Sequence, residues 1–322
     1  MVVGVDTVGP GIFRITVPIP FDLRDVNLYL VDTGDGFLLI DTGVATGEAR
    51  EVIESSVARL GIAFRDIHTI LVTHFHSDHA GLAGRFRELA DAPVIMSGPD
   101  AAFLNRFFTE GPPREPADFF TAHGAPREFD AVARGMFPSL NRLMVPFAAD
   151  RVVDTGDAVA TDRPAVGLLT PGHTPGHLTV FLPEEGVLFA GDHVLPHITP
   201  NIGLYDFGDP NPLGSYFASL HRVRRVAPRR ILPAHGAVLD EPEARIDELL
   251  AHHRRRLDRV ASATGATGAS AWSVSERLFG DGLAPMQAWL AFFESLAHLE
   301  YLVQAGVLRR GAHPESVVYS PC

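Results

Sequence analysis

The segment Ile70–Gly81 (ILVTHFHSDHAG) concentrates side chains that can bind a metal ion, because His74, His76, Asp78 and His79 fall within six residues. Imidazole nitrogens and carboxylate oxygens suit zinc, with iron and manganese as alternatives. In an extended backbone, side chains two residues apart lie on one side, so His74 and His76 can share an ion. Asp78 and His79 point elsewhere, and the segment can therefore serve two metals.

Three further candidate ligands lie in turns that follow apolar segments. His173 follows VGLL in VGLLTPGHTPGH, Asp192 follows GVLFA in GVLFAGDH, and His235 lies in RILPAHG. A histidine or aspartate in a glycine-containing turn usually makes local hydrogen bonds, so each one alone is a weak signal. Their shared position after a strand pattern makes them candidates to complete the metal site.

The elements that must position these residues alternate between strand and helix patterns, which indicates an α/β fold. Residues 26–43 (VNLYLVDTGDGFLLIDTG) are typical of two antiparallel strands joined by a Gly/Asp turn. A helix pattern over residues 48–61 leads into the apolar strand 67–73, where the histidine-rich segment begins. Since sites in α/β sheets lie beyond the carboxyl ends of strands, we expect the metal site there.

A proline-rich stretch at about residues 109–146 interrupts this alternation and predicts a helical insertion. Its phenylalanines could line a channel for an acyl chain or pack in a core. Strand patterns return in RVVDTGDAVA, AVGLLT, HLTVFLP, GVLFAGD and RILPAHG, with a helix at about 216–226. Two such halves, one on each side of the insertion, predict a layered sandwich.

The chain is predicted to divide at residue 262. A helix pattern from Glu243 to about Ser262 precedes ATGATGAS, a small-residue stretch typical of a linker. Helix patterns and a final short β-ribbon in residues 263–322 suit a small winged-helix-like α+β module. We therefore expect residues 1–262 to form the domain that carries the metal site.

Four motifs, THFHSDH, PGHTPGH, AGDH and PAHG, resemble in order the ligand motifs of the metallo-β-lactamase superfamily over about residues 10–240. The resemblance implies an αββα sandwich with two metals at its edge. It assigns the side chains as follows: His74, His76 and His173 to the first metal, Asp78, His79 and His235 to the second, and Asp192 as the bridge. It also implies that Asp41, in LLIDTG, and His177 support the ligands from behind.

Two zinc ions, or iron or manganese, would be the cofactor of such a site. Two close metals can share a water and lower its pKa, so we expect a bridging hydroxide as the nucleophile. Asp78 and Asp192 would orient it while binding metal, and they are the predicted catalytic residues. His193 and His197 lie just past Asp192 and are candidate substrate contacts, and Tyr205 is a candidate donor of a hydrogen bond to a substrate oxyanion.

The resemblance does not settle the substrate, because this superfamily cleaves several kinds of bond. The bridging Asp192 resembles the glyoxalase II and lactonase branches, which favours an acyl thioester or a lactone. A phosphodiesterase or ribonuclease is the alternative, because some ribonucleases of this kind carry a winged helix. A metal-binding regulator without catalysis is a third hypothesis, weakened by a ligand set that leaves an open position.

Charge weighs against nucleic acid as a partner. The formal net charge is -12, and all 27 basic residues are arginine. From residue 263 onward there are three arginines and five acidic residues. A nucleic-acid-reading helix normally presents a cationic face, so we expect the module to pack against the site or form a homodimer. A small acyl substrate is the expected partner.

Cysteine usage and the start of the chain favour a cytoplasmic protein with no membrane partner. Cys322 is the single cysteine, so neither a disulfide framework nor an internal thiolate ligand is expected. The first residues show no secretory signal pattern, and no apolar run reaches membrane-spanning length.

Overall fold

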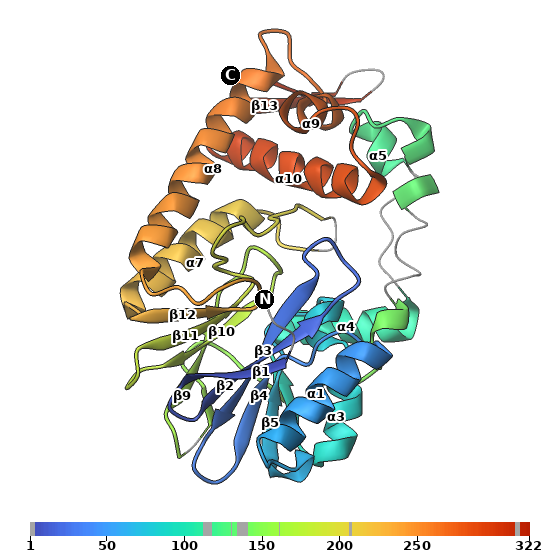
Figure 1. Cartoon of the computed structure of the whole chain (residues 1–322). Helices are drawn as coiled ribbons and strands as arrows, with labels where there is room; N and C mark the ends of the chain where they lie inside the picture. Colours follow the sequence, from blue (N-terminus) through green and yellow to red (C-terminus); the bar gives the residue numbers. More distant parts are fainter. Residues whose placement is uncertain are drawn as a thin grey trace.

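Two mixed β-sheets pack face to face between layers of helices in the computed structural model (Figure 1). It describes residues 4–111, 118–129, 131–133, 141–160, 162–205, 208–312 and 316–322. The core between the sheets includes Tyr29, Ile40 and Leu71 from one sheet and Val180 and Phe189 from the other. This is the expected αββα sandwich.

The first sheet takes its strands in chain order. They are β1 (Gly4–Gly9), β2 (Ile12–Pro18), β3 (Asp25–Asp32), β4 (Phe37–Ile40), β5 (Ile67–Leu71), β6 (Val94–Met96) and β7 (Arg151–Val152). The strands from β1 to β4 pair antiparallel, and those from β4 to β7 pair parallel. The outer face is covered by the helices α1 (Gly47–Arg59), α3 (Ala83–Ala90) and α4 (Gly98–Glu110).

The second sheet has the order β12-β11-β10-β9-β8. Its strands are β8 (Ala158–Ala160), β9 (Ala165–Leu169), β10 (Leu178–Leu182), β11 (Val187–Gly191) and β12 (Arg230–Pro233). Only the β11–β12 pair is parallel among them. The helices α7 (Pro212–Val226) and α8 (Pro242–Thr264) cover its outer face, which completes the second half of the sandwich.

Two elements differ from the sequence prediction in detail. RVVDTGDAVA forms two short strands, β7 and β8, that belong to different sheets, because the turn at Thr155–Gly156 carries the chain across the sandwich. The helix expected over residues 80–90 is broken into α2 (Ser77–Ala80) and α3. The break falls at Gly81, where a Cβ would lie 2.4 Å from the Ser77 carbonyl oxygen and 2.5 Å from that of Gly43. Only glycine allows the backbone segments to approach so closely there.

The C-terminal module consists of α9 (Ala271–Phe279), α10 (Pro285–Gln304) and the hairpin β13 (Leu308–Ala312) with β14 (Val317–Pro321). These elements follow the predicted order, while their identity as a winged helix stays a prediction. Helix α8 runs through the boundary proposed at residue 262 and ends at Thr264. No helix in the described ranges is both long and apolar enough to cross a membrane.

The described part of the insertion packs partly against this module and partly, from Leu143 onward, against the helices of the first half of the sandwich. It includes α5 (Phe119–Ala122), helical residues 127–129 and 131–133, and a 3-10 turn at Asn141–Leu143. Phe120 and Phe129 are buried in one core with Phe292 and Phe293 of α10, and Phe107 is buried beneath the first sheet. The phenylalanines that the structure describes therefore serve as packing residues; Phe137 lies outside the described residues.

Candidate metal centre

Five strands from both sheets end at the same edge of the sandwich, and a polar side chain follows each end. Asp41 follows β4, His74 lies three residues past β5, His173 lies past β9, Asp192 follows β11 and His235 lies past β12. The backbone hydrogen bond from Leu178 N to Thr73 O, at 2.8 Å, ties the two sheets together at this edge. The fold thus gathers side chains that are far apart in the sequence.

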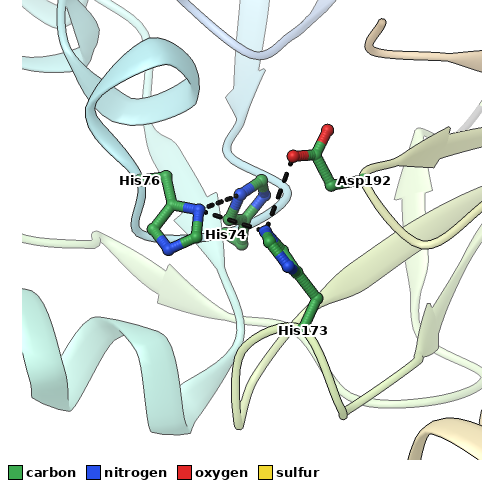
Figure 2. A group of neighbouring side chains, drawn as sticks. All are labelled: His74, His76, His173 and Asp192. Carbon is green, nitrogen blue, oxygen red and sulfur yellow. Dashed lines mark hydrogen bonds and ion pairs between the residues drawn. The ribbon is translucent and has the colours of Figure 1, made fainter. Parts of the chain in front are cut away.

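The first cluster contains His74, His76, His173 and Asp192 (Figure 2). His76 Nδ1 lies 3.0 Å from His74 Nε2 and 3.1 Å from His173 Nε2. His173 Nε2 lies 3.5 Å from Asp192 Oδ2. Ligand atoms of a tetrahedral zinc site, with zinc–nitrogen distances of about 2.0 Å, are about 3.3 Å apart, so this spacing suits one zinc-sized ion.

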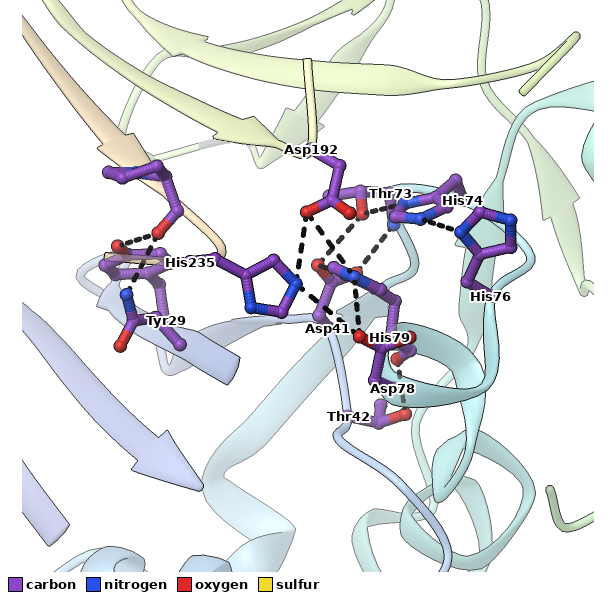
Figure 3. A network of polar contacts seen from close by, with 12 residues as sticks. Tyr29, Asp41, Thr42, Thr73, His74, His76, Asp78, His79, Asp192 and His235 are labelled. Carbon is purple, nitrogen blue, oxygen red and sulfur yellow. Dashed lines mark hydrogen bonds and ion pairs between the residues drawn. The ribbon is translucent and has the colours of Figure 1, made fainter. Parts of the chain in front are cut away.

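The second cluster contains Asp78, His79 and His235 (Figure 3). Asp78 Oδ2 lies 3.6 Å from His79 Nε2 and 3.5 Å from His235 Nε2. Asp192 Oδ1 completes the group, at 3.6 Å from His79 Nε2 and 3.4 Å from His235 Nε2. Asp192 therefore directs Oδ2 toward the first cluster and Oδ1 toward the second, which is the geometry of a bridging carboxylate.

Four of the histidines are oriented by a hydrogen bond from the nitrogen that faces away from the centre. His79 Nδ1 donates to Asp41 Oδ2 at 2.8 Å, and His235 Nδ1 donates to the Asp25 carbonyl at 2.7 Å. His173 Nδ1 donates to the Asn201 carbonyl at 2.8 Å, and His74 Nδ1 contacts Thr73 Oγ1 at 3.1 Å. Each bond fixes the tautomer that presents the Nε2 lone pair to the centre, as metal-binding histidines require.

The Asp41 carboxylate accepts hydrogen bonds from groups that hold or belong to two of these ligands. Besides His79, it accepts hydrogen bonds from the Thr73 backbone N–H, at 2.8 Å, and from Thr73 Oγ1, at 2.9 Å. Its backbone has a positive φ of 64°, a conformation that aspartate adopts more readily than most residues other than glycine. Asp41 thus orients His79 directly and His74 through Thr73, in the supporting role that the resemblance implied.

The electrostatic environment differs between the clusters. Burial lowers the pKa of His76 to about 3, with His173 as the next cause, and burial also lowers the pKa of His74 and His173. These rings are neutral near pH 7 and keep their lone pairs. Burial also lowers the pKa of His79, but Asp78, Asp192 and Asp41 outweigh it and raise that pKa to about 10. The second cluster is therefore a strongly cation-attracting pocket.

The residues present fit two metal ions. Three buried atoms at the second cluster, His79 Nε2, His235 Nε2 and Asp192 Oδ1, have no hydrogen-bond partner. Buried polar atoms are normally satisfied, and here all three converge on one point, as they would around a cation. Side chains of Asp78 and Asp192 are 14% and 10% exposed, so the centre is open to solvent, unlike a closed structural zinc site.

His177 supports the bridge. Its Nε2 accepts a hydrogen bond from the Asp192 backbone N–H at 3.1 Å, and its Nδ1 contacts Thr170 Oγ1 at 2.9 Å. Gly191 has a φ of 49°, and a Cβ there would lie 2.8 Å from His177 Nε2. Glycine is thus required before Asp192, both for the turn and for the close approach of the ring.

Asp100 is a supporting residue that the sequence did not reveal. Its buried carboxylate, at the start of α4, accepts hydrogen bonds from Phe75 N at 3.1 Å, Thr174 Oγ1 at 2.8 Å and Gly176 N at 2.7 Å. It therefore joins the loop of His74 and His76 to the loop of His173. A lone aspartate in a helix pattern carries no signal of this role, because its three hydrogen-bond donors lie 25, 74 and 76 positions away.

The three candidate substrate contacts lie in different environments. The His193 ring is fully buried between His177 and Tyr216, with centroid distances of 6.0 and 5.2 Å. His197 is exposed. The Tyr205 ring packs on Trp289 and Phe293 of α10, with centroids 5.2 and 4.4 Å apart. A role in substrate binding stays a prediction for all three.

Comparison with known proteins places this fold and site in a family. Residues 21–235 match the model of the "Metallo-beta-lactamase superfamily", and residues 257–319 match that of the "Metallo-beta-lactamase-like, C-terminal domain". The chain therefore belongs to the metallo-β-lactamase superfamily. This membership and the two clusters together define a metal-dependent hydrolase.

Three relatives illustrate the range of similarity. A solved "metallo-beta-lactamase family protein" of Thermus thermophilus shares 34% identity and a TM-score of 0.86, over 98% of this chain and 100% of that one. The "Probable metallo-hydrolase YqjP" of Bacillus subtilis is 27% identical over 304 residues, covering 90% of this chain and 92% of the relative. The "Atrochrysone carboxyl ACP thioesterase" of Aspergillus fumigatus is 26% identical over 244 residues, covering 74% of this chain and 44% of the relative.

Proposed function

We propose that this chain is a dinuclear zinc hydrolase of carboxylic ester-type bonds, with acyl thioesters as the first substrate class and lactones as the second. The observation that carries the proposal is Asp192, whose two oxygens face two separate histidine clusters. The donor set of nitrogen and carboxylate oxygen, without thiolate, suits zinc in an open catalytic site.

His74, His76 and His173 would hold one zinc ion, Asp78, His79 and His235 the other, and Asp192 both. When bound, the two ions supply Lewis acidity for a substrate carbonyl and a water of lowered pKa. The chain itself contributes fixed lone pairs, through the outward hydrogen bonds of the histidines. Asp78 and Asp192 are hydrogen-bond acceptors beside the same point, and they would orient the water.

Exposed apolar side chains on two loops support an acyl substrate. Leu23 is 42% exposed and lies two residues before Asp25, whose carbonyl holds His235. Ile198 is 41% exposed and lies three residues before Asn201, whose carbonyl holds His173. We propose that both contact the apolar part of a substrate, since each belongs to a loop that holds a candidate ligand. The fungal thioesterase among the relatives supports the same substrate class.

The C-terminal module gives little support to the ribonuclease alternative. Helix α10 contains two glutamates and no arginine, and its buried positions include Phe292, Phe293 and Leu296. A helix that reads nucleic acid needs an exposed cationic face. Helix α10 serves instead to pack the module against the helices α7 and α8 of the sandwich.

A substrate panel tests the proposal. Zinc-loaded protein would be assayed with acyl-CoA esters, acyl-pantetheine esters, lactones, bis(p-nitrophenyl) phosphate and single-stranded RNA. We expect thioester turnover to exceed the others and to disappear in His173→Ala. RNA or phosphodiester cleavage that exceeds thioester turnover would overturn the substrate class.

Apolar recognition can be tested within the same panel. Leu23→Ser should raise KM for long-chain more than for short-chain thioesters, because it removes apolar contact area. Val152→Ser is the matched control, since Val152 is 56% exposed and pairs on β7 with Met96 of β6, whereas the candidate ligands follow β5, β9, β11 and β12. Equal KM changes in both variants would contradict a contact at Leu23.

A further inference from the structure

A loop over residues 199–205 connects the first cluster to helix α10. The ligand His173 donates from Nδ1 to the Asn201 carbonyl at 2.8 Å. The Asn201 side chain in turn donates from Nδ2 to the carbonyl of Leu290 at 3.3 Å, and Leu204 N donates to the carbonyl of Phe293 at 3.2 Å. Hydrogen bonds thus lead from a metal ligand to the C-terminal module.

These acceptors can take the additional bonds. Leu290 and Phe293 lie inside α10, where each carbonyl already accepts a helical hydrogen bond, but a carbonyl oxygen has two lone pairs. Ile202, between the two attachment points, is fully buried against the outer face of the second sheet. The loop is therefore held on one side by the sandwich and on the other by α10, which lies above it in Figure 1.

Helix α10 is itself firmly placed. His253 on α8 and His298 on α10 are both buried, and His253 Nδ1 lies 3.2 Å from His298 Nε2. His298 Nδ1 donates to the Glu294 carbonyl at 2.7 Å, which leaves Nε2 as the acceptor. Arg256 and Glu294 form an ion pair at 3.2 Å with both side chains 14% exposed. Movement of α10 would break these contacts together.

His173 differs from the other oriented histidines in what holds its partner. His79 and His74 are held by Asp41 and Thr73, which belong to the sandwich itself. The carbonyl that holds His173 belongs to a loop whose side-chain anchor is on the C-terminal module. We propose that the module is part of the metal centre, and that Asn201 is the positioning residue through which α10 fixes the ring of His173.

The test measures metal binding at each cluster separately, and it does not depend on the substrate. In a His235→Ala background the first cluster is intact, and in a His76→Ala background the second is. Zinc affinity would be measured by competition with a chromophoric chelator, and the Co²⁺ absorption spectrum would report coordination. We expect Asn201→Ala to weaken zinc binding about tenfold in the first background, as loss of an orienting contact does, and to leave the second unchanged.

Two further variants sharpen the result. Asn201→Asp keeps the size of the side chain but cannot donate to Leu290, so it should weaken the first cluster as much as Asn201→Ala does. Gln304→Ala is the matched control: Gln304 on α10 donates to the Pro210 carbonyl at 3.2 Å, a similar bond between module and sandwich that contacts no ligand. It should leave both affinities unchanged.

The proposal would be overturned if Asn201→Ala and Asn201→Asp bind zinc at the first cluster as tightly as the parent. It would equally be overturned if both clusters weaken alike, since that pattern indicates a loosened fold. Thermal unfolding of each variant identifies the second case directly. Unchanged zinc affinity in the Asn201 variants would contradict this role of Asn201 even if thioester turnover is lost. Absence of thioester turnover in the parent itself would contradict the proposed function and leave the role of Asn201 to the zinc measurements.

Discussion

The Asp41→Asn substitution probes how the site fixes a tautomer. Asp41 is 2% exposed and accepts hydrogen bonds from Thr73 N, Thr73 Oγ1 and His79 Nδ1, all at 2.8 to 2.9 Å. An asparagine fits the same space but replaces one acceptor oxygen with an N–H donor. If its carbonyl keeps the bond to Thr73 N, its amide group faces His79 Nδ1.

The consequence is a shift of the His79 proton. Nδ1 can no longer donate and becomes an acceptor, so the proton moves to Nε2, the atom that lies 3.6 Å from both Asp78 Oδ2 and Asp192 Oδ1. That nitrogen then has no lone pair for a metal. A hydrogen bond to a charged group contributes about 1.5–3 kcal/mol, which corresponds to roughly 10–100-fold in affinity. We expect a loss of that size at the second cluster.

The assay is zinc competition in the His76→Ala background. ¹⁵N NMR of the imidazoles at saturating zinc identifies which nitrogen of His79 carries the proton, because the metal-free ring is protonated on both nitrogens near pH 7. Asp150→Asn serves as the control, because Asp150 accepts hydrogen bonds from Arg87 on the surface and from Val94 N, away from the centre. Unchanged zinc affinity in Asp41→Asn, with the His79 proton still on Nδ1, would refute the reasoning. A matching loss in Asp150→Asn would point to general destabilisation.

Two other predictions concern carboxylates at the centre. Asp192→Asn leaves one acceptor oxygen for two clusters, so metal content after dialysis should fall from about two ions per chain to about one or fewer, measured by plasma mass spectrometry; retention of two would contradict the bridge. Asp100→Asn replaces a buried, titratable carboxyl group with an uncharged amide of similar size, so this variant is a reference in which the titration of Asp100 is absent. Burial raises the pKa of Asp100 to about 7, despite the hydrogen bonds from Thr174, Gly176 and Phe75 that lower it. The unfolded chain loses this proton near pH 4, so the free energy of unfolding of the parent should fall relative to that of Asp100→Asn as pH rises from about 4 to 7, by at most about 4 kcal/mol. Urea unfolding of both proteins across that range measures the difference, and parallel pH profiles would contradict the raised pKa.

The sequence by itself indicated the seven candidate ligands and predicted the class of fold that the structure shows. The spacing of His74, His76, Asp78 and His79 is local, and it is readable because side-chain direction along a short segment depends on few backbone angles. His173, Asp192 and His235 were readable because each follows a strand pattern, and strand ends converge in an α/β fold. The structure brings all seven into two clusters.

The long-range contacts were decided by tertiary structure alone. Asp100 contacts Thr174 and Gly176, which lie 74 and 76 positions away. Asn201 reaches Leu290 across 89 positions. The split of RVVDTGDAVA between two sheets likewise depends on which neighbours each half meets. None of these residues has a local pattern that distinguishes it from a surface polar group, because its role is set by partners that only the packed sandwich and the C-terminal module bring within hydrogen-bond distance.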